Sequence, residues 1–325
     1  MLTVYIPTGT TLERKLLPDG AECPPEAVWI DLVSPAGTED KTVERALGIA
    51  VPTREEMQEI EVSSRLYVEN GGRYMTATLL CQSDTDTPRI TAVTFILAAH
   101  RLITVRYDDP KPFAIVSAKL GRQCPATVTG ELVLIDLLDA IIDRSADVLE
   151  RIGSAVDEVS HTIFEPRGSR AERSRANTAV LTTIGRKGDL TSKVRESLVS
   201  IGRLVLFLAN EADGMRWAKD MRAQLKSMQR DVQSLSDHVS YLSGKTTFLL
   251  DALLGMVSLE QNNIIKIFSV AAVVFMPPTL VASIYGMNFK IMPELDWWFG
   301  YPMAIGLMLL AAILPYLLFK WKRWL

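Results

Sequence analysis

The residues with the clearest chemical potential lie in and around the apolar C-terminal part of the chain. An amide, small residues and hydroxyls recur at helical spacing among aliphatic residues, and the stretch YGMNF (285–289) follows them. At 3.6 residues per turn this series would form one stripe along a helix. The stripe consists of Asn262, Ile265, Phe268, Ala272, Met276, Thr279 and Ser283.

A ring of such stripes from several copies would present oxygen atoms without carboxylates, which suits a hydrated cation that is held loosely and released quickly. Packing between membrane helices is the alternative reading, because Ser and Thr often serve that purpose in membranes. The spacing alone leaves the two readings about equal.

The stripe lies in a segment that is long and apolar enough to cross a bilayer. Residues 264–284 carry only Lys266 as a charge, and residues 302–319 carry none. About 20 apolar residues cross a hydrocarbon core of roughly 30 Å. The basic tail Lys320–Arg323 predicts that both termini lie in the cytoplasm, with the connecting loop outside. Pro277 and Pro278 would disturb the first span, so that it would face other helices or water.

The spans contain no Asp, Glu, Arg or His. Coupled pumps use such residues, so the sequence favours passive flow of cations down an electrochemical gradient. An interior-negative potential would contribute roughly 4.6 kcal/mol per 100 mV to a divalent ion.

The 325-residue chain shows no pattern typical of an enzyme or of a nucleic-acid-binding protein. His100, His161 and His238 lie in separate segments without a nucleophile, and GKTT (244–247) lacks the glycine and the strand of a phosphate-binding loop. A net charge of -3 without a basic aromatic patch makes nucleic acid an unfavourable partner. The three cysteines form no CxxC pair, and no cofactor is indicated.

The rest of the chain must position the two spans. Residues 1–125 predict mixed α/β structure, with strands at 28–32, 65–68, 74–80, 92–98 and 102–107 and a helix capped by Ser34. Apolar residues in steps of three and four predict a helix over 135–163, a second over 170–210, and a third. The third seam, from Leu225 to Met256, continues into the first span without a break, which favours an oligomeric stalk over an ordinary soluble bundle.

YGMNF, MPEL (292–295), WFGYP (298–302), LEQNNIIKIFSV (259–270) and PPTLVAS (277–283) together resemble the CorA family of magnesium channels. The close match covers about the last 65 residues. The resemblance implies an α+β homopentamer in the bacterial inner membrane, in which each protomer has a cytoplasmic α/β domain, a long helical stalk and a two-helix transmembrane hairpin. The implied boundaries are 1–125 (α/β domain), 126–262 (helical bundle and stalk), 263–285 (pore-lining span), 286–301 (periplasmic loop), 302–320 (second span) and 321–325 (tail).

The resemblance also implies roles for particular residues. Gly286, Met287 and Asn288 would form the outer mouth, where oxygens bind the water shell of Mg²⁺, an ion that dehydrates reluctantly. Met287 would pack to hold the loop, and Glu294 would raise the local concentration of cations. The stripe residues would line the pore, with Ile265, Phe268 and Met276 as hydrophobic constrictions.

Mg²⁺ would be both the transported ion and a regulatory ligand, and Co²⁺ and Ni²⁺ would also pass. The regulatory candidates are carboxylates: Asp84, Asp86, Asp220, Asp231 and Asp251. A solvated acidic loop is the simpler reading of Asp84 and Asp86. Two other functions stay open, a zinc importer similar to ZntB and a membrane-anchored sensor that transports nothing.

Overall fold

The computed structural model describes residues 1–18, 20–125, 127–165, 170–214, 217–288 and 292–322. The chain divides into two compact units, Met1–Leu250 and Asp251–Leu325. The first unit contains a seven-stranded sheet in the order β2-β1-β3-β7-β6-β5-β4. Its strands are β1 (Leu2–Thr8), β2 (Thr11–Leu17), β3 (Trp29–Val33), β4 (Leu66–Glu69), β5 (Gly72–Cys81), β6 (Arg89–Ala98) and β7 (Arg101–Arg106).

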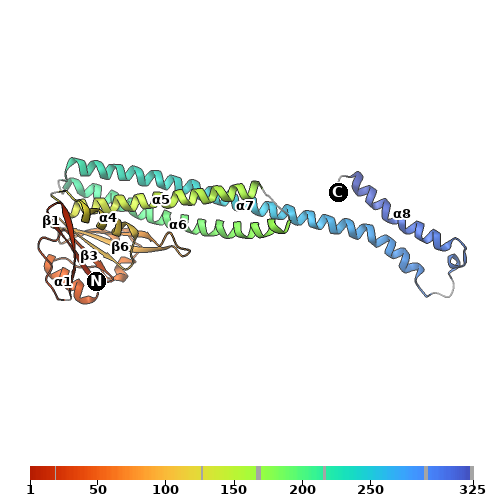
Figure 1. The fold of residues 1–325 in the computed structure, drawn as a ribbon, viewed down its shortest axis with the longest axis horizontal. Helices are drawn as coiled ribbons and strands as arrows, with labels where there is room; N and C mark the ends of the chain where they lie inside the picture. The colour runs from red at the N-terminus through yellow and green to blue at the C-terminus, as the bar shows by residue number, and fades with distance from the viewer. Residues whose placement is uncertain (19, 126, 166–169, 215–216, 289–291, 323–325) are drawn as a thin grey trace. The chain divides into compact units, whose positions relative to one another are not determined.

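Helices cover both faces of this sheet (Figure 1). One core lies between the sheet and two short helices, around Val43 and Met57. The other lies between the sheet and the long helices, around Trp29, Phe95 and Phe113. The helices are α1 (Gly37–Leu47), α2 (Arg54–Met57), α3 (Val62–Arg65), α4 (Lys111–Arg122), α5 (Gly130–Phe164), α6 (Arg170–Gly214), α7 (Lys219–Tyr285) and α8 (Gly300–Trp321), with a 3₁₀ turn η1 (Pro293–Asp296) before α8.

Each strand predicted from the sequence is present, with ends that differ by a few residues. The strands predicted at 92–98 and 102–107 form the hairpin of β6 and β7, which turns at Ala99 and His100, two residues with positive φ. This is the geometry of a type I′ turn, whose twist matches that of the strands. The prediction that Ser34 caps a helix is wrong. Ser34 has φ 44°, its N–H donates to the carbonyl of Arg106, and α1 begins after Ala36.

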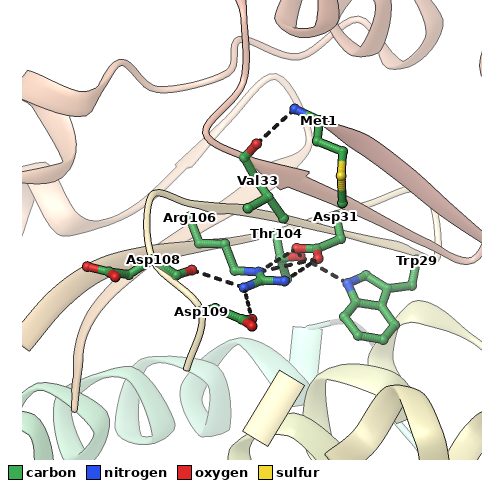
Figure 2. Close-up of polar contacts among 8 residues, drawn as sticks. All are labelled: Met1, Trp29, Asp31, Val33, Thr104, Arg106, Asp108 and Asp109. Atoms are coloured by element: carbon green, nitrogen blue, oxygen red, sulfur yellow. Dashed lines mark hydrogen bonds and ion pairs between the residues drawn. The ribbon is translucent and has the colours of Figure 1, made fainter. Parts of the chain in front are cut away.

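The only parallel strand pair in the described sheet joins β3 to β7, and a buried polar network crosses it (Figure 2). Trp29 Nε1 donates to Thr104 Oγ1 at 3.0 Å, and Thr104 Oγ1 donates to Asp31 Oδ1 at 2.7 Å. Arg106 donates to both oxygens of Asp31, with Nη2 to Oδ2 at 2.9 Å, and to Asp109 at 2.5 Å. Both charged side chains are less than 10% exposed, so each depends on the other for its charge compensation.

The seam of α7 is buried inside the chain. Leu225, Val232, Leu242 and Leu249 are each at most 6% exposed. Gly153 of α5 faces Leu242, and Gly202 of α6 faces Val232. The seam therefore serves a bundle within one chain, and the inference that it joins copies in a stalk is wrong for these residues.

Two polar residues interrupt the predicted seams, and both are satisfied locally. Ser145 Oγ donates to the carbonyl of Ile141 at 2.9 Å, and Thr246 Oγ1 donates to that of Leu242 at 2.7 Å. Each hydroxyl thus binds the carbonyl four residues back on its own helix. The prediction that α7 continues into the first apolar span is confirmed, because α7 is a single helix of 67 residues.

We expect Asp31→Ala to lower the thermal unfolding temperature of the full-length protein in detergent by on the order of 10 °C. The substitution leaves the Arg106 guanidinium buried without its main partner, which costs about 3–5 kcal/mol. Asp213→Ala is the matched control, because it breaks the exposed Arg222–Asp213 pair, whose N–O distance is 2.9 Å. Exposed pairs contribute roughly 0–1 kcal/mol. Equal shifts in the two variants would contradict a structural role for the buried pair.

Candidate transport pathway

The YGMNF stretch begins where α7 ends. Gly286 N donates to the carbonyl of Ala282 at 2.9 Å, and Met287 N donates to that of Ile284 at 3.3 Å. A Cβ on Gly286 would lie 3.0 Å from the Ala282 carbonyl oxygen, so the close backbone approach at the helix end favours glycine. Asn288 follows as an exposed residue outside the helix, while Phe289 lies outside the described residues.

Met287 was predicted to pack and so hold the loop. Its side chain is 48% exposed, so burial within one chain does not anchor it. The structure leaves both the Met287 thioether and the Asn288 amide accessible. Any packing of Met287 must therefore come from outside the single chain.

The predicted stripe lies on the part of α7 that follows the bundle. Its residues are all exposed, with Ile265 at 60%, Phe268 at 71% and Met276 at 69%. The other four residues of the stripe are also exposed: Asn262, Ala272, Thr279 and Ser283. The described part of the chain thus leaves the stripe uncovered, in contrast to the buried seam earlier in the same helix.

Two prolines lie within α7 without ending it. Pro277 and Pro278 have no N–H, so the carbonyls of Val273 and Val274 lose their usual helical donors. The prolines thus remove hydrogen bonds without ending the helix, which runs on to Tyr285. Thr279 Oγ1 donates to the carbonyl of Phe275 at 2.7 Å, in the same turn. Freed carbonyls in an apolar span need a donor from protein or water.

The second apolar helix, α8, begins with a close contact that the sequence did not reveal. Gly300 is buried, and its N–H donates to the carbonyl of Trp297 at 2.9 Å. A Cβ on Gly300 would lie 2.2 Å from the Glu294 carbonyl oxygen, which is far inside van der Waals contact. The absence of a side chain at Gly300 therefore allows the turn that carries Glu294 to approach the start of α8. A glycine between aromatic residues was the only sequence signal.

The acidic loop between β5 and β6 is confirmed as a loop, but its carboxylates already contact cations. Asp84 accepts hydrogen bonds from Lys111, Arg144 and Arg151, which hold the pKa of its carboxyl far below the usual range. Asp84 is therefore ionised throughout the neutral range. Asp86 contacts Arg186 at 3.2 Å and is 86% exposed.

The other predicted regulatory carboxylates are spread along α7. Asp220, Asp231 and Asp251 are all exposed. Among the described residues, no group of three or more Asp, Glu, His or Cys side chains lies close enough to hold a metal ion.

Two helices, α7 and α8, are long and apolar enough to cross a membrane. Only 6% of the residues in the most apolar window of each helix are buried. The charge-free windows expose large side chains such as Leu280, Leu310 and Leu314. The combination of length, low charge and low burial is typical of membrane spans.

Comparisons with known proteins agree with this architecture. Residues 25–323 match the model of the family described as CorA-like Mg²⁺ transporter protein. A magnesium transport protein CorA from Pasteurella multocida is 38% identical over 299 residues, which is 92% of each chain.

Among solved structures, the CorA magnesium transporter from Methanocaldococcus jannaschii has the same fold, with a TM-score of 0.76 at 17% identity over 100% of this chain and 99% of that one. The ZntB cytoplasmic domain from Vibrio parahaemolyticus is more distant, with a TM-score of 0.58 at 8% identity, covering 79% of this chain and 97% of that one. The chain belongs to the CorA-like Mg²⁺ transporter family.

Proposed function

We propose that the chain forms a passive, Mg²⁺-gated channel that imports Mg²⁺ across the bacterial inner membrane as a homopentamer. Family membership over residues 25–323 is the observation that carries this proposal. Co²⁺ and Ni²⁺ are further cargo, because the path is carboxylate-free and holds the hydrated ion through its waters. Both chain ends lie in the cytoplasm, and the loop between the spans lies outside.

The pore is lined by the exposed stripe of α7, because two spans from one chain cannot enclose a path. Ile265, Phe268 and Met276 form hydrophobic constrictions, and the pore closes when water leaves them. Asn262 and Thr279 supply oxygens on either side of these constrictions. The exposed state of each of these side chains in one chain supports a role that needs several copies.

The copies meet on surfaces other than the buried seam. Tyr241 and Phe248 lie one heptad apart on α7, and each is 59% exposed. An exposed aromatic pair at heptad spacing supports a helix–helix contact between chains. The same α7 helices would then form both the contact between copies, through Tyr241 and Phe248, and the apolar constrictions of the pore.

Gly286, Met287 and Asn288 form the outer mouth. The Asn288 amide oxygen and the backbone carbonyls around it accept hydrogen bonds from the waters of Mg²⁺, so the ion keeps its octahedral shell. Glu294, on the turn after the mouth, adds negative charge and attracts cations electrostatically. The zinc-importing alternative is less well supported, because the ZntB domain is the more distant structural match.

We expect Asn288→Ala to reduce Mg²⁺ flux into proteoliposomes by at least tenfold, because the mouth loses its ring of amide oxygens. Asn263→Ala removes an exposed amide that lies off the stripe of α7 and should leave the flux within twofold of wild type. Wild-type protein that moves no Mg²⁺ would identify a tether or sensor instead. Zn²⁺ flux that exceeds Mg²⁺ flux and depends on a pH gradient would identify a zinc importer.

We expect Gly300→Ala to weaken Mg²⁺ uptake at low external Mg²⁺ more than at saturating Mg²⁺. The new methyl group must displace the turn of Glu294, so the effect should resemble that of Glu294→Gln, with a several-fold higher half-saturating concentration. Gly306→Ala is the matched control on the same helix, because a Cβ there meets no atom within 4 Å. If Gly300→Ala and Gly306→Ala have equal kinetics, Gly300 does not position Glu294.

Internal Mg²⁺ regulates the channel through carboxylates of neighbouring copies, with Asp251, Asp231, Asp220, Asp84 and Asp86 as the candidates. We expect Asp251→Asn to raise the internal Mg²⁺ concentration for half-inhibition of flux several-fold, because one negative charge per chain is removed. Asp237→Asn is the control, since Asp237 is an exposed carboxylate of α7 that contacts Gln233 at 3.1 Å. The same inhibition curve for wild type and Asp251→Asn would exclude Asp251 from regulation.

A further inference from the structure

A cavity of about 510 Å³ lies in the first unit, between the sheet and α6. It exists because the edge strand β4 begins only at Leu66, opposite Met75, whereas β5 continues to Cys81. Beyond Met75, β5 therefore has no strand on that side, and α6 takes its place. Thr78 N donates to Ser200 Oγ at 2.9 Å, so a side chain of α6 satisfies an amide at this open edge.

Three arginines line this cavity, and none of them contacts a carboxylate among the described residues. Arg65 donates to the carbonyl of Glu59 and to Thr78 Oγ1, and Arg195 donates to Ser240 Oγ at 3.0 Å. Arg203 has no hydrogen-bond partner in the described part of the chain, and its side chain is exposed. Elsewhere in the first unit, arginines such as Arg106 and Arg144 contact aspartates.

The charge balance of the cavity is positive although the protein as a whole has a net charge of -3. Glu196 is the one carboxylate among the lining residues, against the three guanidinium groups. A smaller cavity of about 240 Å³ shares Arg65, Thr78 and Glu196 with it and adds Arg54 and Asp108, so its two arginines face two carboxylates. The excess of positive charge is therefore confined to the larger cavity.

One wall of the larger cavity is apolar and accessible. Ile60 is 88% exposed, Val62 46% and Val199 45%. Exposed aliphatic side chains in the same cavity as guanidinium groups that contact no carboxylate fit a ligand that has both an apolar body and an anionic end. Ligand cavities commonly enclose about 300–1,000 Å³, and this one falls within that range.

We propose that this cavity binds a phosphorylated small molecule with a flat apolar ring, of the nucleoside phosphate class. Guanidinium groups match phosphate oxygens in fork geometry and also stack on planar rings, which an ammonium group does not do. Arg195 and Arg203 of α6, together with Arg65, bind the phosphates. Ile60, Val62 and Val199 contact the ring. This site is separate from the pore and from the regulatory carboxylates.

The test is calorimetric titration of the full-length protein in detergent with ATP, inorganic triphosphate and adenosine. The protein is purified in EDTA and titrated in Mg²⁺-free buffer, so that chelation of residual Mg²⁺ adds no heat. We expect saturable binding of ATP with a submillimolar dissociation constant. Triphosphate should bind at least tenfold more weakly, because it lacks the ring, and adenosine should bind more weakly still.

The variant Arg195→Gln/Arg203→Gln should weaken ATP binding at least tenfold. Arg186→Gln/Arg222→Gln removes the same charge from two exposed arginines that pair with Asp86 and Asp213 outside the cavity, and should bind as wild type does. Absence of saturable ATP binding, or equal weakening in both double variants, would overturn the proposal. Absence of binding together with a smaller oligomer mass in Arg195→Gln/Arg203→Gln would show that the cavity surface joins copies of the chain. None of these readouts depends on ion transport.

Discussion

The structure depends on the continuity of α7, a single helix whose two halves require different surroundings. Its first half buries an apolar seam against α5 and α6, while its second half exposes apolar side chains on all sides. Burial of Leu225 and Leu242 fixes the helix within a packed bundle. Exposed Ile265 and Phe268 require lipid or other copies, since water would be unfavourable. No proline separates the two parts, and Gly255 lies between them without ending the helix.

The sheet supports this helix through interactions that are complete within one chain. The Asp31–Arg106 pair joins the parallel strands β3 and β7, and Trp29 and Thr104 extend it into the core beneath the helices. At the far edge, Ser200 of α6 replaces a missing strand by accepting the amide of Thr78. The helices thus pack against the sheet through apolar side chains at its centre, and α6 is hydrogen-bonded to it near its edge.

Much of this architecture could be predicted from the sequence, because periodicity reports burial directly. The alternation in β5 to β7 and the three-four steps of α5 and α7 predicted these elements. The same periodicity could not identify the partner of a seam, so the prediction that the α7 seam joins copies was wrong. An apolar stripe looks the same whether α5 of the same chain or a helix of another chain covers it.

Features that depend on tertiary approach were beyond sequence reasoning. The β1–β2 hairpin and α4 were not predicted, since charged residues in β2 obscure its alternation. Gly300 became informative only when the Glu294 carbonyl was found beside it. Asp84 is an ordinary acidic loop residue in sequence, yet three cations from α4 and α5 converge on it.

The charged groups that stabilise the fold are paired within the chain, whereas the polar groups proposed to bind other molecules are not. Asp31 and Asp84 find cationic partners within the chain, so their negative charge is compensated before any ion arrives. Asn288, Arg203 and Asp251 have no such compensation in the described structure and are exposed. Repetition around a ring of copies would turn the single groups Asn288 and Asp251 into sites. Arg203 differs, because it lines a cavity of one chain together with Arg65 and Arg195. In the functions proposed above, the amide and the carboxylate would face cations, whereas the arginines of the α6 cavity would face an anion.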